Sequence, residues 1–414
     1  MATSGDGRGN RCGALAAGLA LLCAVGAAVP AVPAAADDGP TPLPSTDATA
    51  PALRLPVMPP FLDPTQSSCT KPSSTVMKAV PWAQQSLDLT RAHQLTSGAG
   101  VTVAVIDTGV SAAAPALRGR VTAPGAAGHD CVGHGTFVAG IIAAAPAAGS
   151  GFSGVAPAAR ILAVQGVGAD GNPDEAKVAA GIRHATDAGA KVIDVSLAFA
   201  TQSQALTSAV DYAAGHDVLI VAAGVPDNIR VDSDTDQGPP QIPFWPATQS
   251  GVLSVVDIDI NGGRSTATVD PARADLAAPG QGITGIGPGG RGHFLGNGPS
   301  IAAAFTAGAA ALVRAYDPAL TAPEVATRLT TAAYPAPIPR LDPYAALSAV
   351  LPTDPGTGAV LPAQQTHVIK LVLNDEDPTP AHRAFLILAA SLLAALTLTA
   401  LALLNRRRRR NRTT

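Results

Sequence analysis

Apolar segments of strand length recur between residues 81 and 350, and they alternate with longer alanine-rich stretches. A strand without polar residues must be covered on both faces, as in a parallel sheet that carries helices on either side. The chain is therefore predicted to form an α/β domain over residues 81–350, with a mostly parallel sheet and helices on both faces. The predicted strands are VTVAVI (101–106), ARILAVQ (159–165), KVIDVSL (191–197), VLIVAA (218–223) and VLSVV (252–256).

The segments on either side of this domain differ from it in composition. Residues 37–80 begin with a stretch rich in Pro, Ala and Thr that has no apolar period, so they are predicted to form an extended N-terminal arm. Residues 351–383 contain PTDPGTGAV and NDEDPTPAHR, which indicate a Pro-rich and acidic linker. No internal repeat is recognisable.

Both ends of the chain indicate export and membrane attachment. Residues 1–36 have two arginines, an apolar stretch and then PAVPAAA, which is typical of a cleavable signal peptide; an uncleaved anchor is the alternative. Residues 384–404 are uncharged and apolar, long enough to cross a bilayer of about 30 Å, and a buried core helix is the alternative. The arginine-rich tail at 405–414 should stay cytoplasmic, which predicts a single-pass plasma-membrane protein with an extracytoplasmic domain.

Charge and cysteine content agree with an exported domain. Residues 37–383 contain 19 lysines and arginines against 29 aspartates and glutamates, so nucleic acid is an unfavourable partner. Two of the four cysteines, Cys12 and Cys23, lie in the predicted signal peptide and would leave with it. The other two, Cys69 and Cys131, favour one disulfide in an oxidising compartment. Zinc binding is the rival interpretation, but the spacing of cysteines and histidines matches no familiar ligand set. No cofactor and no metal are expected.

Three polar residues stand at positions where chemistry is plausible. Asp107 ends an apolar strand in VAVIDTGV, His134 begins an alanine-rich helix in GHGTFVAGIIAA, and Ser300 lies at the start of another in GNGPSIAAAFTAGAAAL. A serine hydroxyl needs a base to accept its proton, and a carboxylate can orient that base. A turn-capping Asp, an ordinary helix His and a plain N-cap Ser are the structural alternatives.

These strings resemble the subtilisin-like serine proteases (subtilases), in which Asp, His and Ser follow in this order. The likeness extends to GVAPAARILAVQ, KVIDVSLA, VLIVAAG and DLAAPG, so it covers roughly residues 80 to 350. The resemblance implies the subtilase fold and a serine endopeptidase whose catalytic residues are Asp107, His134 and Ser300.

Two positions depart from the subtilase pattern near the expected oxyanion site. Val225 stands where the family has the Asn whose amide donates to the oxyanion, and Pro299 replaces the Thr before the nucleophile. The backbone N–H of Ser300 then remains as the main donor, unless the nearby Asn228 bends back to substitute. Loss of the amide donor in a subtilisin slows turnover by about 10²- to 10³-fold, so attenuated activity is expected and an Asn restored at 225 should raise it.

The resemblance also implies where a peptide substrate would bind. Subtilases bind the peptide as an added strand, which uses main-chain hydrogen bonds for affinity and side-chain pockets for specificity. The ends of buried strands are the structural alternative for each of these positions. The corresponding residues here are Ser196, Leu197 and Ala198 for the added strand, and Ala222, Ala223 and Gly224 for the pocket.

Among subtilases, the chain is most similar to the mycosins, the membrane-anchored proteases of type VII secretion systems. PWAQQSLDL and SGAGVTVAVIDTGV are similar to that subgroup. The resemblance implies an N-terminal extension tied by a disulfide near the catalytic His, which here would join Cys69 to Cys131. Mycosins commonly have another disulfide in the catalytic domain, for which this chain has no cysteines.

Two functions of different classes are consistent with the sequence. The first is a serine endopeptidase that cleaves protein or peptide substrates at the outer face of the plasma membrane, in association with a type VII secretion complex. The second is a catalytically silent relative that serves as a structural component of that complex. A peptidoglycan hydrolase has little support, because no paired carboxylates stand at a recognisable spacing.

Overall fold

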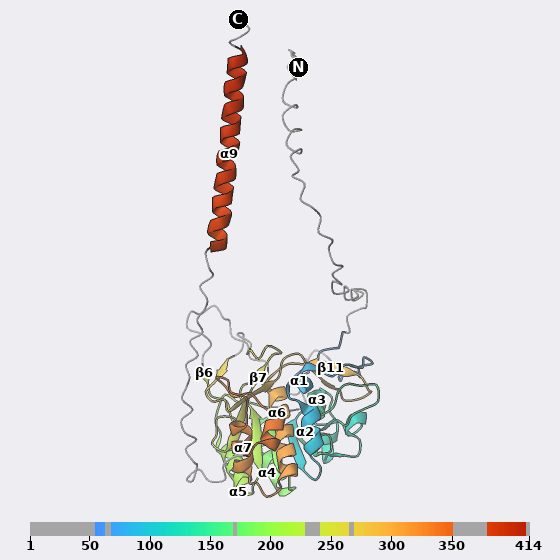
Figure 1. Cartoon of the computed structure of the whole chain (residues 1–414). Coiled ribbons are helices and arrows are strands. Elements are labelled where there is room, and N and C mark those ends of the chain that lie inside the picture. Colours follow the sequence, from blue (N-terminus) through green and yellow to red (C-terminus); the bar gives the residue numbers. More distant parts are fainter. Residues whose placement is uncertain are drawn as a thin grey trace, which may run out of the picture.

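The computed structural model describes residues 54–62, 68–168, 172–227, 241–264, 269–350 and 379–410. A seven-stranded sheet lies at its centre (Figure 1), with the order β2-β3-β1-β4-β5-β7-β9. All six neighbouring pairs are parallel. The strands are β1 (Thr102–Asp107), β2 (Val121–Thr122), β3 (Arg160–Gln165), β4 (Val192–Val195), β5 (Leu219–Ala223), β7 (Val252–Ile258) and β9 (Leu276–Pro279).

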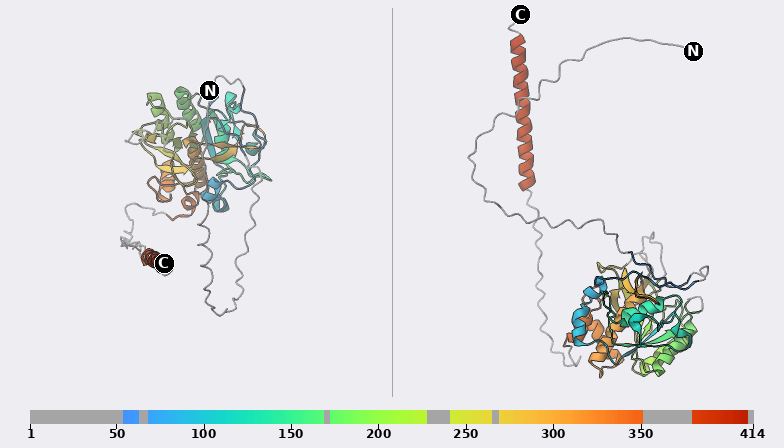
Figure 2. Two further views of the ribbon diagram at one scale, coloured as in Figure 1. Left: turned by 90° about the horizontal axis from the view of Figure 1, so that it is seen from above. Right: turned by 90° about the vertical axis from the view of Figure 1, so that its right-hand side faces the viewer.

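Helices cover both faces of this sheet. Alternate residues of β1 belong to different apolar clusters, since Val103 and Val105 pack on one side and Ala104 and Ile106 on the other. The first side is covered by α3 (His134–Ala143) and α6 (Pro299–Tyr316), and the second by α4 (Glu175–Asp187) and α5 (Gln204–Gly215). Figure 2 (left) shows the green helices and the orange helices on opposite sides. The predicted α/β architecture is confirmed.

The shorter elements surround this frame. Strands β10 (Ile283–Ile286) and β11 (His293–Gly296) form an antiparallel hairpin, and β6 (Gln241–Ile242) pairs with β8 (Asp270–Pro271). The remaining helices of the folded body are α1 (Trp82–Ser86), α2 (Leu89–Leu95), η1 (Pro115–Leu117), η2 (Gly125–Gly128), α7 (Ala322–Thr331) and α8 (Pro343–Ser348).

The described part of the N-terminal arm runs along β11. The Met58 N–H donates to the Leu295 carbonyl over 2.7 Å, and the His293 N–H donates to the Thr75 carbonyl over 2.8 Å. Backbone pairing of this kind satisfies the exposed edge of a hairpin. The described part of the arm therefore lies against the domain.

Helix α9 (Thr379–Arg410) is the last described element and is red in Figure 1. Over the described residues, no helix has both the length and the apolar character that a membrane crossing requires. The predicted signal peptide at 1–36, most of the linker at 351–383, and residues 411–414 of the tail lie outside the described residues.

Candidate active site

Three elements bring the predicted site residues together. Asp107 is the last residue of β1, His134 is the first residue of α3, and Ser300 follows Pro299 at the start of α6. Parallel strands end at one edge of a sheet, and helix starts that pack at that edge present free backbone N–H groups. The order of elements therefore explains how residues far apart in the sequence share one site.

The three side chains form a continuous hydrogen-bonded row. His134 Nδ1 lies 3.0 Å from Asp107 Oδ1 and 2.9 Å from Oδ2. On the other side of the ring, His134 Nε2 lies 3.3 Å from Ser300 Oγ. All three residues are buried, and Asp107 and Ser300 have no exposed surface. Nδ1 faces a carboxylate, which fixes the tautomer that leaves Nε2 free to accept a proton from the serine.

A buried carboxylate next to the row fixes the start of α3. Asp130 accepts hydrogen bonds from the N–H groups of Gly133 and Thr136, over 2.7 and 2.8 Å, and from the Thr136 hydroxyl over 2.6 Å. It also accepts from the hydroxyl of Thr108, the residue that follows Asp107, over 2.8 Å. A carboxylate at a helix N-terminus satisfies orphan N–H groups and complements the helix dipole. Asp130 thus ties the end of β1 to the helix that carries His134.

The ionisable groups of the row stabilise each other's charges. Burial by itself lowers the pKa of His134, but the carboxylates of Asp107 and Asp227 outweigh burial and raise that pKa well above its ordinary value. Burial raises the pKa of Asp107, yet the charge and hydrogen bond of His134 outweigh it, so the pKa of Asp107 is lowered. Burial and the charge of Asp107 raise the pKa of Asp194, on β4, well above its usual range. Asp107 and His134 therefore form a buried ion pair beside a carboxyl group that favours its neutral form.

The sequence pattern of the subtilase family matches residues 98–365, a range that contains all three residues of the row. This chain is a subtilase. Mycosin-3 of Mycobacterium tuberculosis is 35% identical to it over 79% of this chain and 84% of its own length, which shows the mycosin type. The chain is therefore a serine protease of that type.

Solved structures agree with this assignment. The crystal structure of MycP1 from Mycobacterium smegmatis matches this subtilase with a TM-score of 0.60 and 28% identity, over 74% of this chain and 94% of that one. A chain of the periplasmic assembly from the ESX-5 inner membrane complex also matches with a TM-score of 0.60 and 28% identity, over 70% of this chain and 89% of that one.

Besides Asp130 and Asp194, a third carboxylate that the sequence did not indicate lies at the subtilase site. Asp227 Oδ1 accepts from the Ser300 N–H over 3.0 Å, and Asp227 Oδ2 accepts from the Ser300 hydroxyl over 2.6 Å. Asp227 Oδ2 also lies 3.3 Å from His134 Nε2. The only sequence signal was its place two residues after Val225, in the loop where the family pattern is broken.

The positions that depart from the pattern have different surroundings. Val225 has no exposed surface and packs with Phe244 and Val269, so its side chain belongs to a small apolar cluster. Pro299 is the first residue of α6, where a missing N–H costs no helical hydrogen bond. Asn228, the predicted substitute donor, lies outside the described residues. Among the described residues, the Asp227 carboxylate contacts Ser300, whereas the Val225 side chain packs into the apolar cluster, so the effect of an Asn at 225 stays a prediction.

The predicted substrate-binding residues lie at the ends of two adjacent parallel strands. Ala222 and Ala223 end β5 and are buried, and the N–H of Gly224 donates to the Val255 carbonyl over 2.8 Å. Ser196 is also buried, and its hydroxyl donates to Asp194 Oδ2 over 3.3 Å.

The two residues after Ser196 are only partly buried. Leu197 packs against the apolar cluster of α4 and α5, and Ala198 packs against the cluster that contains Val225. Their backbone continues directly from the end of β4, which lies between β1 and β5 in the sheet.

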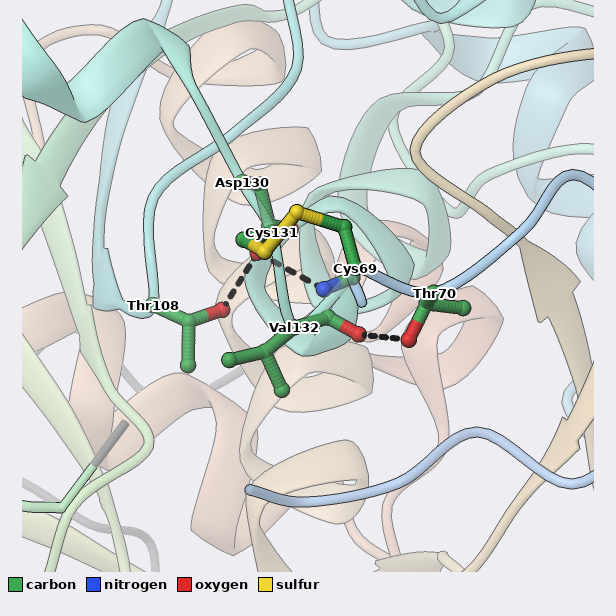
Figure 3. The surroundings of a disulfide bond; sticks show 7 residues. Cys69, Thr70, Thr108, Asp130, Cys131 and Val132 are labelled. Carbon is green, nitrogen blue, oxygen red and sulfur yellow. Dashed lines mark hydrogen bonds between the residues drawn. A yellow bond between two sulfur atoms is a disulfide. The ribbon is translucent and has the colours of Figure 1, made fainter. Parts of the chain in front are cut away.

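A disulfide joins Cys69 to Cys131, as the sequence predicted (Figure 3). The Thr70 N–H donates to the Cys131 carbonyl over 2.9 Å, and the Thr70 hydroxyl donates to the Val132 carbonyl over 2.5 Å. Cys131 follows Asp130 directly, so the arm is covalently attached beside the carboxylate that fixes α3. The disulfide also excludes both cysteines as zinc ligands.

No group of three or more His, Cys, Asp or Glu side chains within the described ranges is arranged to hold a metal ion. Of the histidines without a motif, His293 is 3% exposed. Its Nδ1 accepts from the Met77 N–H over 3.1 Å, and its Nε2 lies 3.4 Å from the Ser150 hydroxyl. His293 thus holds the arm against β11.

Proposed function

We propose that Asp107, His134 and Ser300 hydrolyse peptide bonds in this mycosin-type subtilase. The observation that carries the proposal is the placement of His134, whose two ring nitrogens lie within 3.3 Å of a carboxylate on one side and of the serine hydroxyl on the other. This is the relation between orienting acid, base and nucleophile that serine hydrolysis requires.

The reaction follows from the roles of the three groups. Ser300 Oγ attacks the scissile carbonyl carbon while its proton passes to His134 Nε2, and the carbonyl oxygen becomes an oxyanion. His134 then gives that proton to the leaving amine, the C–N bond breaks, and an acyl ester on Ser300 remains. Water attacks the ester with His134 again as the base, which frees the acid product and restores the serine. Asp107 holds the ring and stabilises its charged form.

The substrate is a protein or peptide chain that binds in extended form. Strands β4 and β5 are adjacent and parallel; residues 196–198 follow β4, and residues 222–224 form the end of β5 and the position after it. Partly buried Leu197 and Ala198 would line the added strand, and Ala222, Ala223 and Gly224 would line the pocket for the side chain before the cut.

The enzyme works at the outer face of the plasma membrane as a single-pass protein. The sequence supports this through the signal-like residues 1–36, the uncharged run at 384–404 and the arginines that follow it. The similarity to a chain of the ESX-5 inner membrane complex supports association with a type VII secretion complex.

Activity is attenuated relative to other subtilases. The donors expected from an Asn at 225 and a Thr at 299 are missing, because Val and Pro stand at these positions. One missing donor of this kind corresponds to a loss of about 10² to 10³ in turnover.

Labelling with a serine-directed fluorophosphonate tests the proposed function. Ser300 Oγ would form a bond to phosphorus, fluoride would leave, and His134 would take the proton. Full-length protein in mild detergent should be labelled, and Ser300→Ala should not. Equal labelling of the two would refute Ser300 as the nucleophile.

A structural role in the secretion complex is the second candidate. It is favoured by one observation, that Ser300 has no exposed surface in this conformation. Absence of labelling and of peptide cleavage in every variant, with secretion lost on deletion but restored by Ser300→Ala, would support this candidate instead.

A further inference from the structure

Asp227 accepts hydrogen bonds from both groups with which Ser300 would take part in catalysis, its hydroxyl and its backbone N–H. The Ser300 hydroxyl donates to Asp227 Oδ2 over 2.6 Å, whereas it lies 3.3 Å from His134 Nε2. A hydroxyl has one hydrogen, so while it donates to the carboxylate it cannot donate to the base. The Ser300 N–H, the remaining oxyanion donor, is also taken, because it donates to Asp227 Oδ1 over 3.0 Å.

The shape of the chain around the nucleophile fits this carboxylate. Ser300 is fully buried, and the Asp227 side chain above it is only 9% exposed. Gly298, the N-cap of α6, has φ 143°, and a Cβ at that position would collide with the Asp227 carboxylate. A glycine at 298 therefore leaves room for the contact between Asp227 and Ser300. This contact places the Asp227 carboxylate, an anion, where the oxyanion of the reaction would form.

Charge adds to this steric effect. An oxyanion and a carboxylate within hydrogen-bonding distance of the same N–H repel each other strongly in a buried site. The same carboxylate faces His134, which also interacts with Asp107 on β1 and Asp194 on β4, while Asp130 before α3 faces Asp107. Asp107 and Asp227 together raise the pKa of His134, which favours the charged form that cannot accept the serine proton.

We propose that the Asp227 side chain is an intramolecular block of the oxyanion site, so that the folded protein is a latent protease until this carboxylate is displaced or neutralised. The inference rests on the proposed function of Ser300. Position 227 is then the place where a substitution can supply the missing oxyanion donor. An amide is isosteric with a carboxylate, so Asp227→Asn replaces an acceptor at the oxyanion site by an N–H donor.

The test compares fluorophosphonate labelling rates of the full-length protein and its variants. Asp227→Asn should be labelled at least about 10²-fold faster than the unaltered protein, since it gains a donor and loses an opposing charge. Asp227→Ala should fall between them, because the block is removed without a donor. Asp174→Asn, which removes one partly buried acidic charge from the cap of α4, is the matched control and should label like the unaltered protein.

The pH profile gives a readout that a purely structural role would not change. The acid limb of the labelling rate should move to lower pH in Asp227→Asn, because one of the two carboxylates that raise the His134 pKa is gone. Melting curves of every variant verify folding. Equal rates and equal acid limbs for the unaltered protein and Asp227→Asn would overturn the block while leaving Ser300 as nucleophile. Folded variants that all fail to label would overturn the proposed function itself.

Discussion

Replacement of Asp130 by alanine should destabilise the protein more than the loss of an ordinary helix cap. Asp130 is 5% exposed and accepts four hydrogen bonds, two from backbone N–H groups and two from hydroxyls. The hydroxyls can turn to other acceptors, but the N–H groups of Gly133 and Thr136 cannot. Each buried N–H left without a partner costs about 1–3 kcal/mol, so the loss should be about 4 kcal/mol.

Asp174 provides the matched comparison. It caps α4, where it accepts one exposed hydrogen bond from the Lys177 N–H over 3.1 Å. Its replacement by alanine should cost about 1 kcal/mol.

Calorimetry of both variants in the absence of reducing agents, so that the disulfide stays intact, measures the difference. A cost of about 4 kcal/mol corresponds to a fall in Tm of roughly 10 °C, against about 3 °C for Asp174→Ala. If Asp130→Ala melts no lower than Asp174→Ala, the carboxylate does not fix the start of α3 and the reasoning fails.

Three further predictions concern the arm and the altered loop. Cys69→Ser should lower the free energy of unfolding by about 4 kcal/mol in urea titrations, since the disulfide closes a separation of 62 residues; an unchanged midpoint would contradict this. Val225→Asn should lower the free energy of unfolding by about 3 kcal/mol and give no faster labelling, because the amide would be buried among apolar side chains. Faster labelling would show that an amide at position 225 does donate to the oxyanion. Burial lowers the pKa of His293 below its ordinary 6.5, so its contribution to stability is present above that pH and is lost as the pH falls through the lowered pKa. His293→Gln should flatten this part of the stability–pH curve, and an unchanged slope would contradict the role of His293.

The sequence predicted those features that depend on local pattern. The apolar strand before Asp107 and the small residues after His134 and Ser300 fix where each element begins or ends, because burial and helix geometry act over neighbouring residues. Parallel strand order then follows from alternating strands and helices. Local pattern thus placed each of the three residues at the end or start of an element, and the resemblance to the subtilases implied that they converge.

The features that the sequence did not reveal depend on contacts between distant segments. Pro226 leaves the direction of the following turn undetermined from the sequence. In the structure Val225 packs against Phe244 and Val269, and Asp227 contacts Ser300. The sequence drew attention to the missing donor at 225 and to Asn228 as its substitute. The structure instead brings in the carboxylate between them, a difference in turn geometry that no local periodicity encodes.

The network of Asp130 was missed for a similar reason. An Asp beside a cysteine has no recognisable signature, and its value lies in hydrogen bonds to both Thr108 and the start of α3. The path of the arm along β11 likewise depends on backbone pairing across more than 200 positions, as between Met58 and Leu295, which composition does not predict.

The most direct test of the account is a structure of the full-length Asp227→Asn variant after reaction with a peptidyl phosphonate. The account predicts phosphorus bonded to Ser300 Oγ and a phosphonyl oxygen about 2.7–3.1 Å from both the Ser300 N–H and the introduced amide. The His134 ring should lie between the Asp107 carboxylate and Ser300 Oγ. A phosphonate on another residue, or an oxygen turned away from the Ser300 N–H, would contradict it.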